Sequence, residues 1–581
     1  MNMKRTLISL TLVIAQITVG LAQQMTVTVD SVGQLSKQLP DSIRYTISEL
    51  KICGPLNGSD LKIIQLMTSR LKAKKPTDAV LTSLDLSEAT ITESKGGFRT
   101  RADLLPAAMF LNCKALEKVA LPNGTNEVSR SCFSGCVSLK EVIIPENVRI
   151  INDYAFNGCV NLASITLPYD LQTIENHAFD GCVSLRAIDI PETVTSIDNY
   201  AFNNCKNLEK VTLDAAINRI SNAMFMGCER LHSIIIPQSV TVIGSDAFRE
   251  CTSLESVDMP DAISEIGNSA FEDCMNLRSI EINTAMRIGS ETFKNCTSLH
   301  TVEIENAKRI GNGAFEGCTG LTNISIDGNM LAVGDETFAG CTSLISCTLP
   351  LTVKSIGRRA FFECKSLSDI DLPSSLTRIY DHAFENCASL RTITIPQMTK
   401  QLGSDCFENC TSLDSVDIQG FVDKIDNDVF RRCHSLRYIS LPVSVKSIGD
   451  NAFMECSSLT SIILPISISS IGDNAFEKCA SITSMNIPAA CYTIGSAAFR
   501  ECSGLQRISM PAAIKKIGGN AFAKCVSLRE VDIAAPIPPN ISQSTFKGVI
   551  LNACRVMVPR GAKNNYRENK SWKKIPQIVE K

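Results

Sequence analysis

Cysteine is the residue type in this sequence whose number and spacing first suggest chemistry. The chain of 581 residues contains 25 cysteines, and a thiolate can ligate a metal, act as a nucleophile or form a disulfide. Successive cysteines of one series are 23 residues apart from Cys113 through Cys274. The next two steps, to Cys296 and to Cys318, are 22 residues, and the steps from there to Cys525 are 23 residues again. Nineteen cysteines therefore share one register, and they pose a single question about their role.

Packing explains this series of cysteines better than metal binding or disulfide formation does. Repeats stacked about 5 Å apart bring neighbouring cysteines close together, but their Cβ vectors run parallel, which is poor disulfide geometry. A buried free cysteine behaves as a small hydrophobic residue. Two C-x-x-x-C pairs, Cys132 with Cys136 and Cys406 with Cys410, have spacings that suggest metal or redox chemistry. Their positions in the repeat explain them more simply.

No other pattern indicates a catalytic, cofactor or metal site. The metalloprotease, serine-hydrolase and P-loop motifs are absent. His177 and His382 share one repeat position but lie nine repeats apart, on the order of 45 Å, so they cannot share a metal. Paired carboxylates lie on an open face, where we expect no separation of their pKa values. We therefore predict a protein that is not an enzyme, with no catalytic residue, no cofactor and no metal. Only Cys53 and Cys554 lack a repeat role, and whether either forms a disulfide stays open.

The cysteines belong to a repeat that also fixes a phenylalanine three residues earlier. The unit reads L-x-x-I-x-I-P-x-x-V-x-x-I-G-x-x-A-F-x-x-C-x-S, and 20 of the 23 phenylalanines occupy its phenylalanine position. In the unit beginning at Leu185, Ile188 and Ile190 alternate as in a short strand with one buried face. Pro191 ends that strand because it has no N–H to donate. The second apolar step, V-x-x-I, fits a strand or a loop. One unit cannot close a core alone, so stacked units must share one, which predicts a solenoid.

These residues resemble the BspA-type leucine-rich repeats of exported proteins from host-associated bacteria. The resemblance implies a leucine-rich-repeat solenoid of about 20 stacked repeats, each with a short parallel β-strand, between an N-terminal α/β cap and a C-terminal helical cap. We assign residues 23–80 to the N-terminal cap, 81–554 to the repeats and 555–581 to the C-terminal cap, which should hold a short strand and a helix. The caps are needed because an open solenoid end exposes its core.

The N-terminal cap should contain one amphipathic helix. Leu61, Ile64 and Met67 recur at helical spacing. Ser59 or Asp60 precedes them and is a residue type that caps helix N-termini, so we expect one of the two to be the N-cap.

Residues 1–22 have the pattern of a secretory signal peptide. Lys4 and Arg5 precede an apolar run, and Gly20-Leu21-Ala22 forms a small-x-small cleavage site. No later stretch has about 18 uninterrupted apolar residues, so we expect no transmembrane segment. The net charge of −3 gives no field that would attract nucleic acid. We predict an exported protein, at the cell surface or extracellular, with the periplasm as the alternative.

The outward positions of the strands are where a ligand would bind. Most are Ser, Thr or Asp, but Asp258, Glu281 and Glu303 occupy this position in three consecutive repeats. Like charges opposite one another destabilise a sheet, so we predict that these three carboxylates form a ligand-binding site for a cation or a basic protein surface. Two of them lie by the shortened repeats, where Asn283 and Glu305 replace the usual proline. The alternative is a solvated acidic face, as most exposed charge runs are.

The resemblance implies a binding or adhesion role for an exported, non-catalytic protein, which we expect to be a monomer. Its partners would be extracellular or surface proteins or glycans. A first alternative is a structural scaffold for protein–protein interaction in the periplasm or envelope. A second is a hydrolase within the caps, although the cap segments are short and carry no recognisable nucleophile–base pair.

Overall fold

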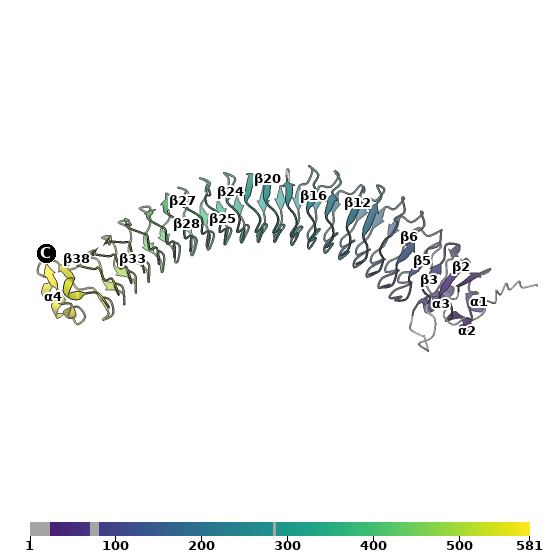
Figure 1. The fold of residues 1–581 in the computed structure, drawn as a ribbon, viewed down its shortest axis with the longest axis horizontal. Helices are drawn as coiled ribbons and strands as arrows, with labels where there is room; N and C mark the ends of the chain where they lie inside the picture. The colour runs from purple at the N-terminus through teal and green to yellow at the C-terminus, as the bar shows by residue number, and fades with distance from the viewer. Residues whose placement is uncertain (1–23, 70–80, 283–285) are drawn as a thin grey trace, which may run out of the picture. The chain divides into compact units, whose positions relative to one another are not determined.

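The structure is a computed structural model that describes residues 24–69, 81–282 and 286–581. The predicted signal peptide, residues 1–22, lies outside the described residues, as do residues 70–80 and Asn283. The chain divides into two compact units, residues 1–168 and residues 169–581. Figure 1 shows the order of the elements along the chain.

The first unit combines the N-terminal helices with a parallel sheet. The helices are α1 (Leu35–Gln38), α2 (Asp41–Arg44) and α3 (Gly58–Thr68). The sheet has the order β1-β2-β3-β5-β7, with β4 paired to β2, and β6 pairs with β8. Its strands are β1 (Gln24–Thr28), β2 (Glu49–Leu56), β3 (Ser83–Asp85), β4 (Ala89–Ile91), β5 (Lys118–Ala120), β6 (Glu127–Val128), β7 (Glu141–Ile143) and β8 (Ile150–Ile151).

Helix α3 confirms the predicted apolar face but corrects the predicted cap. Leu61, Ile64 and Met67 are buried. The N-cap is Asn57, not Ser59 or Asp60: its side chain accepts hydrogen bonds from the backbone N–H groups of both of those residues. Asp60 lies three positions further on, and its carboxylate accepts from the Asn57 N–H at 3.1 Å. The reciprocal pair is a capping box, which satisfies N–H groups that have no partner within the helix.

Most repeats of the second unit begin with a first strand, whose outward side chains alternate with buried ones; the repeats that begin at Leu367 and Leu459 lack it. Ile188 and Ile190 of β10 are buried, whereas Asp189 is exposed, as predicted for that strand. The first strands are β10 (Ala187–Ile190), β12 (Lys210–Leu213), β14 (Ser233–Ile235), β16 (Ser256–Asp258), β18 (Ser279–Ile282), β20 (Thr301–Ala307), β22 (Asn323–Gly328), β24 (Ser346–Thr348), β27 (Thr392–Ile395), β29 (Ser415–Ile418), β31 (Tyr438–Ser440), β34 (Ser484–Asn486), β36 (Arg507–Met510) and β38 (Glu530–Ile533).

The second apolar step, which sequence left open between strand and loop, is a two-residue strand. These second strands pair in parallel from repeat to repeat. They are β9 (Thr173–Ile174), β11 (Ser196–Ile197), β13 (Arg219–Ile220), β15 (Val242–Ile243), β17 (Glu265–Ile266), β19 (Arg287–Ile288), β21 (Arg309–Ile310), β23 (Ala332–Val333), β25 (Ser355–Ile356), β26 (Arg378–Ile379), β28 (Gln401–Leu402), β30 (Lys424–Ile425), β32 (Ser447–Ile448), β33 (Ser470–Ile471), β35 (Thr493–Ile494) and β37 (Lys516–Ile517).

The first strands do not form one uninterrupted sheet. In the second unit they hydrogen-bond in separate groups, β10-β12, β14-β16, β18-β20-β22-β24, β27-β29-β31 and β34-β36-β38. The outward face of the first strands is therefore built from short sheets. This division determines which outward side chains lie directly opposite one another.

The core is a column of phenylalanines with a parallel column of cysteines. Neighbouring rings of the second unit stack with centroids 5.1–5.7 Å apart. Most repeat-position thiols donate to the phenylalanine carbonyl oxygen of the preceding repeat, as the Cys251 Sγ does to the Phe225 oxygen at 3.1 Å. The first of the series, Cys113, donates instead to the Thr68 hydroxyl at 3.1 Å. Among the described residues all 25 cysteines are free, and all except Cys53 are buried. The predicted packing role of the cysteines thus includes a hydrogen bond between repeats.

The C-terminal segment contains the expected strand and helix and one strand more. It comprises η2 (Leu551–Ala553), β39 (Arg555–Val558), α4 (Lys563–Glu568), η3 (Trp572–Lys574) and β40 (Ile578–Glu580). Strands β39 and β40 extend the sheet of β38. Trp572 covers the last ring of the phenylalanine column, Phe546, edge-on at 6.0 Å. Its indole N–H donates to the Pro539 oxygen at 2.7 Å, so its polar atom is satisfied in the core.

Candidate functional site

The structure places two of the three predicted carboxylates directly opposite one another. Glu281 of β18 and Glu303 of β20 are register partners, and both are exposed. Asp258 is also exposed, but its strand β16 pairs with β14 and not with β18. The acidic site therefore consists of one pair joined by a hydrogen-bonded ladder, with Asp258 on the end strand of the neighbouring sheet.

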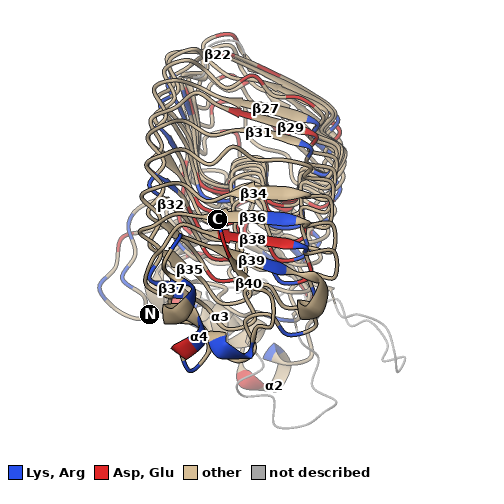
Figure 2. Cartoon of the chain, turned by 90° about the vertical axis from the view of Figure 1, so that its left-hand side faces the viewer, with Lys and Arg blue, Asp and Glu red and all other residues tan. Residues whose placement is uncertain are grey.

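The pairing of Glu281 with Glu303 is an exception to how charges are arranged elsewhere in the sheets. Lys118 and Glu141 are register partners of opposite sign and form an ion pair at 2.9 Å. Arg507, Glu530 and Arg555 alternate in sign along β36, β38 and β39 (Figure 2). Such opposite pairs stabilise a sheet, whereas like charges destabilise it.

A second pair of like charges lies in the same two repeats. Arg287 of β19 and Arg309 of β21 are register partners, and both are exposed. Among the strand registers of the described residues, these two places are the only ones where like charges lie directly opposite. Both fall in the repeats that sequence identified as shortened to 22 residues. The two arginines were not predicted from the sequence; comparing the residue before I-G from repeat to repeat would have found them.

The replacement of proline has a visible effect at this place. Strand β20 continues through Glu305, where other repeats have proline, and reaches Ala307, with an irregular register between Ile304 and Ala307. Because glutamate has an N–H group and no fixed φ, the extended conformation is not forced to end there. At seven residues, β20 is longer than the neighbouring first strands.

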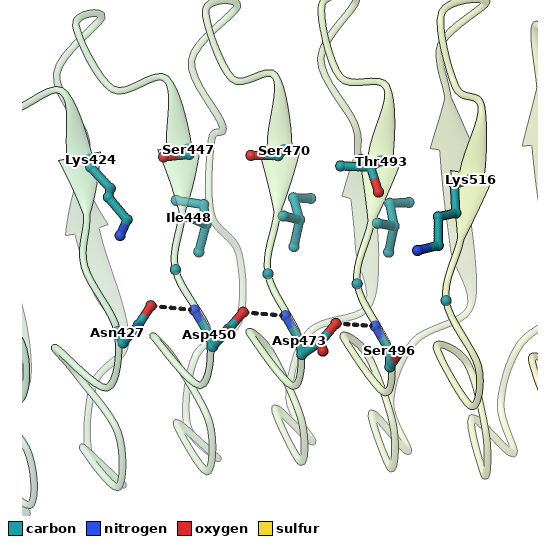
Figure 3. A pocket seen from close by; sticks show the side chains of 16 residues that line it. Lys424, Asn427, Ser447, Ile448, Asp450, Ser470, Asp473, Thr493, Ser496 and Lys516 are labelled. Atoms are coloured by element: carbon teal, nitrogen blue, oxygen red, sulfur yellow. Dashed lines mark hydrogen bonds between the residues drawn. The ribbon is translucent and has the colours of Figure 1, made fainter.

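The I-G dipeptides form grooves along the second strands. One groove, of about 520 Å³, runs past Ser447, Ser470 and Thr493, and Lys424 and Lys516 lie at its two ends (Figure 3). Its lower wall is a chain of side-chain to backbone hydrogen bonds; the Asp450 carboxylate, for example, accepts from the Asp473 N–H at 2.7 Å. A second groove, of about 320 Å³, includes Arg287 and Arg309.

Glycine is required at the bottom of these grooves. A Cβ atom added to Gly311 would lie 2.4 Å from the backbone nitrogen of Ser290, and one added to Gly289 would lie 2.5 Å from that of Asn268. Close stacking of successive repeats therefore excludes a side chain here. The consequence is a floor with no side chains, which a ligand can approach closely.

One carboxyl group away from the open strand face has a perturbed pKa. The pKa of Glu408 is raised from its ordinary value to about 7, chiefly by burial and then by a hydrogen bond with Asp405. Glu385 adds to the effect, and Arg431, 3.4 Å away, opposes it. The sequence expectation considered only the open strand face. Glu408 lies instead in the turn that follows Phe407, where the neighbouring repeats cover it.

His177 and His382 each lie beside a carboxylate of their own repeat, and the Cys251 thiol is buried. The Nδ1 atom of His177 lies 3.0 Å from Asp180, and that of His382 lies 2.7 Å from Glu385, so each histidine has a local carboxylate partner. Burial raises the pKa of the Cys251 thiol to about 12, which removes its reactivity at neutral pH. Within the described ranges, no three His, Cys, Asp or Glu side chains are placed to hold a metal ion.

No helix in the part of the chain that the structure describes has the length and hydrophobicity to cross a membrane. No curated protein matches this sequence. Among solved structures, a leucine-rich repeat protein from Bacteroides ovatus is 26% identical, with a TM-score of 0.34, and the alignment covers 76% of this chain and 84% of that one. A leucine-rich cell surface protein from Faecalibacterium prausnitzii is 24% identical, with a TM-score of 0.33 and coverage of 60% and 88%.

The pneumococcal vaccine antigen PcpA is 17% identical over 71% of this chain and 93% of its own, with a TM-score of 0.33. The family described as "BspA type Leucine rich repeat region (6 copies)" matches residues 104–232, 218–345, 331–442 and 423–552. These overlapping segments span residues 104–552, which contain the whole of the phenylalanine and cysteine columns. The chain belongs to the BspA-type leucine-rich-repeat family.

Proposed function

We propose that this chain is an exported, non-catalytic binding protein that presents its first strands to protein or glycan ligands at the cell surface or outside the cell. Asp258, Glu281 and Glu303 form the contact site in this proposal. The observation that carries it is the direct opposition of Glu281 and Glu303, because a sheet gains nothing from two facing carboxylates.

The surroundings of the acidic pair support a role in binding. Glu281 and Glu303 have no ion-pair partner among the described residues, so both carboxylates are available to a cation. Neighbouring strands are about 4.8 Å apart, a separation that lets one lysine or arginine of a partner contact both groups. The ligand class is therefore a basic protein surface, with a cation-bearing glycan as the other possibility.

The test compares the binding of matched variants. The mature chain is screened against immobilised extracellular-matrix proteins, mucins and glycans at physiological salt, together with Glu281→Gln/Glu303→Gln and the triple variant that also carries Asp258→Asn. The control is Asp189→Asn/Asp371→Asn, which removes two exposed carboxylates from the same repeat position elsewhere. We expect the acidic-site variants to lose at least about tenfold in affinity and the control to bind normally.

A stability measurement separates a binding site from a structural one. Removing the facing charges should leave the thermal midpoint unchanged or raise it, because repulsion is lost. Equal binding by all variants would move the contact site elsewhere on the protein. Failure of the native chain to bind any of these ligands, with capture of envelope proteins from the producing cell, would favour the scaffold alternative.

A further inference from the structure

We propose that the groove bordered by Arg287 and Arg309 binds the sulfate or carboxylate groups of an acidic glycan. This groove is lined by the polar and charged residues Ser245, Glu265, Asn268, Arg287, Ser290 and Arg309, together with Gly267, Gly289, Gly311 and the largely buried Ile266 and Ile288. It lies on the second strands, whereas the acidic site lies on the first strands. The inference therefore goes beyond the function proposed above and does not depend on it.

The charges in the groove favour an anion. Arg287 and Arg309 are register partners on adjacent strands, and neither guanidinium has an ion-pair partner among the described residues. Glu265 is opposite Arg287 on the other side, but the two side chains form no ion pair within 4.0 Å. The groove thus holds two guanidinium groups against one carboxylate. A sulfate or carboxylate between the arginines would relieve their repulsion and accept their paired N–H groups.

The rest of the lining suits a ligand that carries many hydroxyl groups. The Ser245 and Ser290 side chains line the groove, and their hydroxyls make no hydrogen bond to any described residue. Gly267, Gly289 and Gly311 form a floor without side chains, so a sugar ring can approach the backbone. The backbone N–H of Ser290 is already bound by the Asn268 side chain at 2.9 Å, which holds this wall in place.

The same features argue against an acidic peptide as the ligand. Strand β19 is paired on both sides, with β17 and with β21, so it has no free edge to which a peptide strand could add. Its groove contains no aromatic side chain, and Ile266 and Ile288 point into the core. A peptide would therefore find neither backbone partners nor an apolar pocket, whereas a glycan needs only hydroxyl and anion contacts.

The larger groove provides a comparison within the same molecule. It is built from the same I-G repeats, but its two lysines are accompanied by two carboxylates, Asp450 and Asp473. Lys424 is also held by Asp426 at 2.7 Å, and Lys516 lies four repeats away from it. The larger groove is thus balanced in charge and holds no facing cations, so its shape alone should not bind an acidic glycan.

The experiment measures the affinity of a heparin octasaccharide by calorimetry at 150 mM NaCl. The experiment compares the mature chain with the double variant Arg287→Gln/Arg309→Gln. The matched control is the double variant Lys424→Gln/Lys516→Gln, which removes two cations from the same repeat position. We expect the arginine variant to bind at least about tenfold more weakly and the lysine variant to stay within about twofold of the native chain. The arginines are exposed, so the variant should retain the native circular dichroism spectrum.

Three further probes identify the anion and the class of ligand. A desulfated heparin octasaccharide and a hyaluronan octasaccharide distinguish sulfate from carboxylate, and binding of either kind that depends on the arginines supports the proposal. If polyglutamate binds as tightly as the heparin octasaccharide, with the same dependence on Arg287 and Arg309, the proposal that the ligand is a glycan is wrong. Equal losses in the arginine and lysine variants, or no binding of any acidic glycan, would overturn the site.

Discussion

Glu408 shows how the stacking of repeats changes the chemistry of a single residue. Its own turn would leave a glutamate in water, but the neighbouring repeats contribute Glu385 on one side and Arg431 on the other. Burial raises the pKa of Glu408 to about 7 despite the arginine. No local sequence signal indicates this value, because F-E occurs in several repeats and the surroundings come from residues about 23 positions away.

The raised pKa of Glu408 predicts that the stability of the folded protein decreases as the pH rises. The ordinary pKa of glutamate in the unfolded chain is 4.5, whereas folded Glu408 has about 7. Between these values the folded state retains a proton that the unfolded state has released, so stability decreases as pH rises through this window. Glu408→Gln stays neutral, and its stability relative to the native chain should increase from pH 5 to pH 8 in urea unfolding experiments.

Glu501 provides a control of opposite sign. Lys524 lies 2.7 Å from its carboxylate and lowers the pKa of Glu501 below the ordinary value. Its stabilisation is present above the unfolded-state pKa and is lost as pH falls through the folded pKa. Glu501→Gln should therefore be less stable than the native chain at neutral pH, with a difference that shrinks in acid. Parallel pH profiles for the native chain and Glu408→Gln would refute the assignment of Glu408.

At the scale of elements, helix α3 shows which parts of the fold a sequence reveals. Its buried face was predicted because Leu61, Ile64 and Met67 repeat at helical spacing. Its N-cap was not predicted correctly, because Ser59 and Asp60 are good capping residues that follow directly on Asn57. The signal that distinguishes them is the reciprocal spacing, Asn57 three residues before Asp60. The division of the first strands into separate sheets had no such signal in the repeat pattern.

The capping box predicts unequal effects of three neighbouring substitutions. Asn57→Ala should destabilise the first unit by about 1 kcal/mol. Asp60→Ala should cost more, about 3 kcal/mol, because the buried carboxylate accepts from the N–H groups of Gly33, Leu35 and Asn57. Ser59→Ala is the control and should change stability by less than about 0.5 kcal/mol.

Hydrogen exchange of the α3 amides, together with thermal unfolding, checks this order. If the α3 amides exchange faster in the Ser59→Ala variant than in the Asn57→Ala variant, the assignment of Asn57 as the N-cap is wrong. Asp60→Asn retains one acceptor oxygen and should fall between the native chain and Asp60→Ala.

At the scale of the whole molecule, the phenylalanine and cysteine columns are what the sequence predicts best. Their spacing identifies the repeat, and the residues at those positions, such as Phe202 and Cys205, are completely buried. The binding surfaces are predicted less well. Glu281 and Glu303 could be located by alignment of the repeats, but the gap that separates them from Asp258 could not. Arg287 and Arg309 could be found by comparing the residue before I-G between repeats. Their direct opposition, however, depends on the second apolar step being a strand, which sequence left undecided.

The cysteine column predicts a sharp difference between native and unfolded protein in thiol labelling. Cys53 is partly exposed, and the other 24 of the 25 cysteines are buried. N-ethylmaleimide at pH 7.5 should add one label to the native chain and 25 in urea, as counted by mass spectrometry. Cys53→Ser should remove the native label. A mass in urea that lacks pairs of labels would reveal disulfides and contradict the packing role.

The stack of free thiols also makes the unfolding of this protein irreversible under oxidising conditions. In the native state all sulfurs except that of Cys53 are buried, and most of those in the repeat position donate to a carbonyl of the preceding repeat, as Cys251 does to Phe225. Once the chain opens in an oxidising medium, sulfurs from any two repeats can couple, and few of the resulting cross-links are compatible with refolding. The thermal unfolding and refolding curves should therefore differ when the protein is heated and cooled in air. With a reductant present, the two curves should coincide.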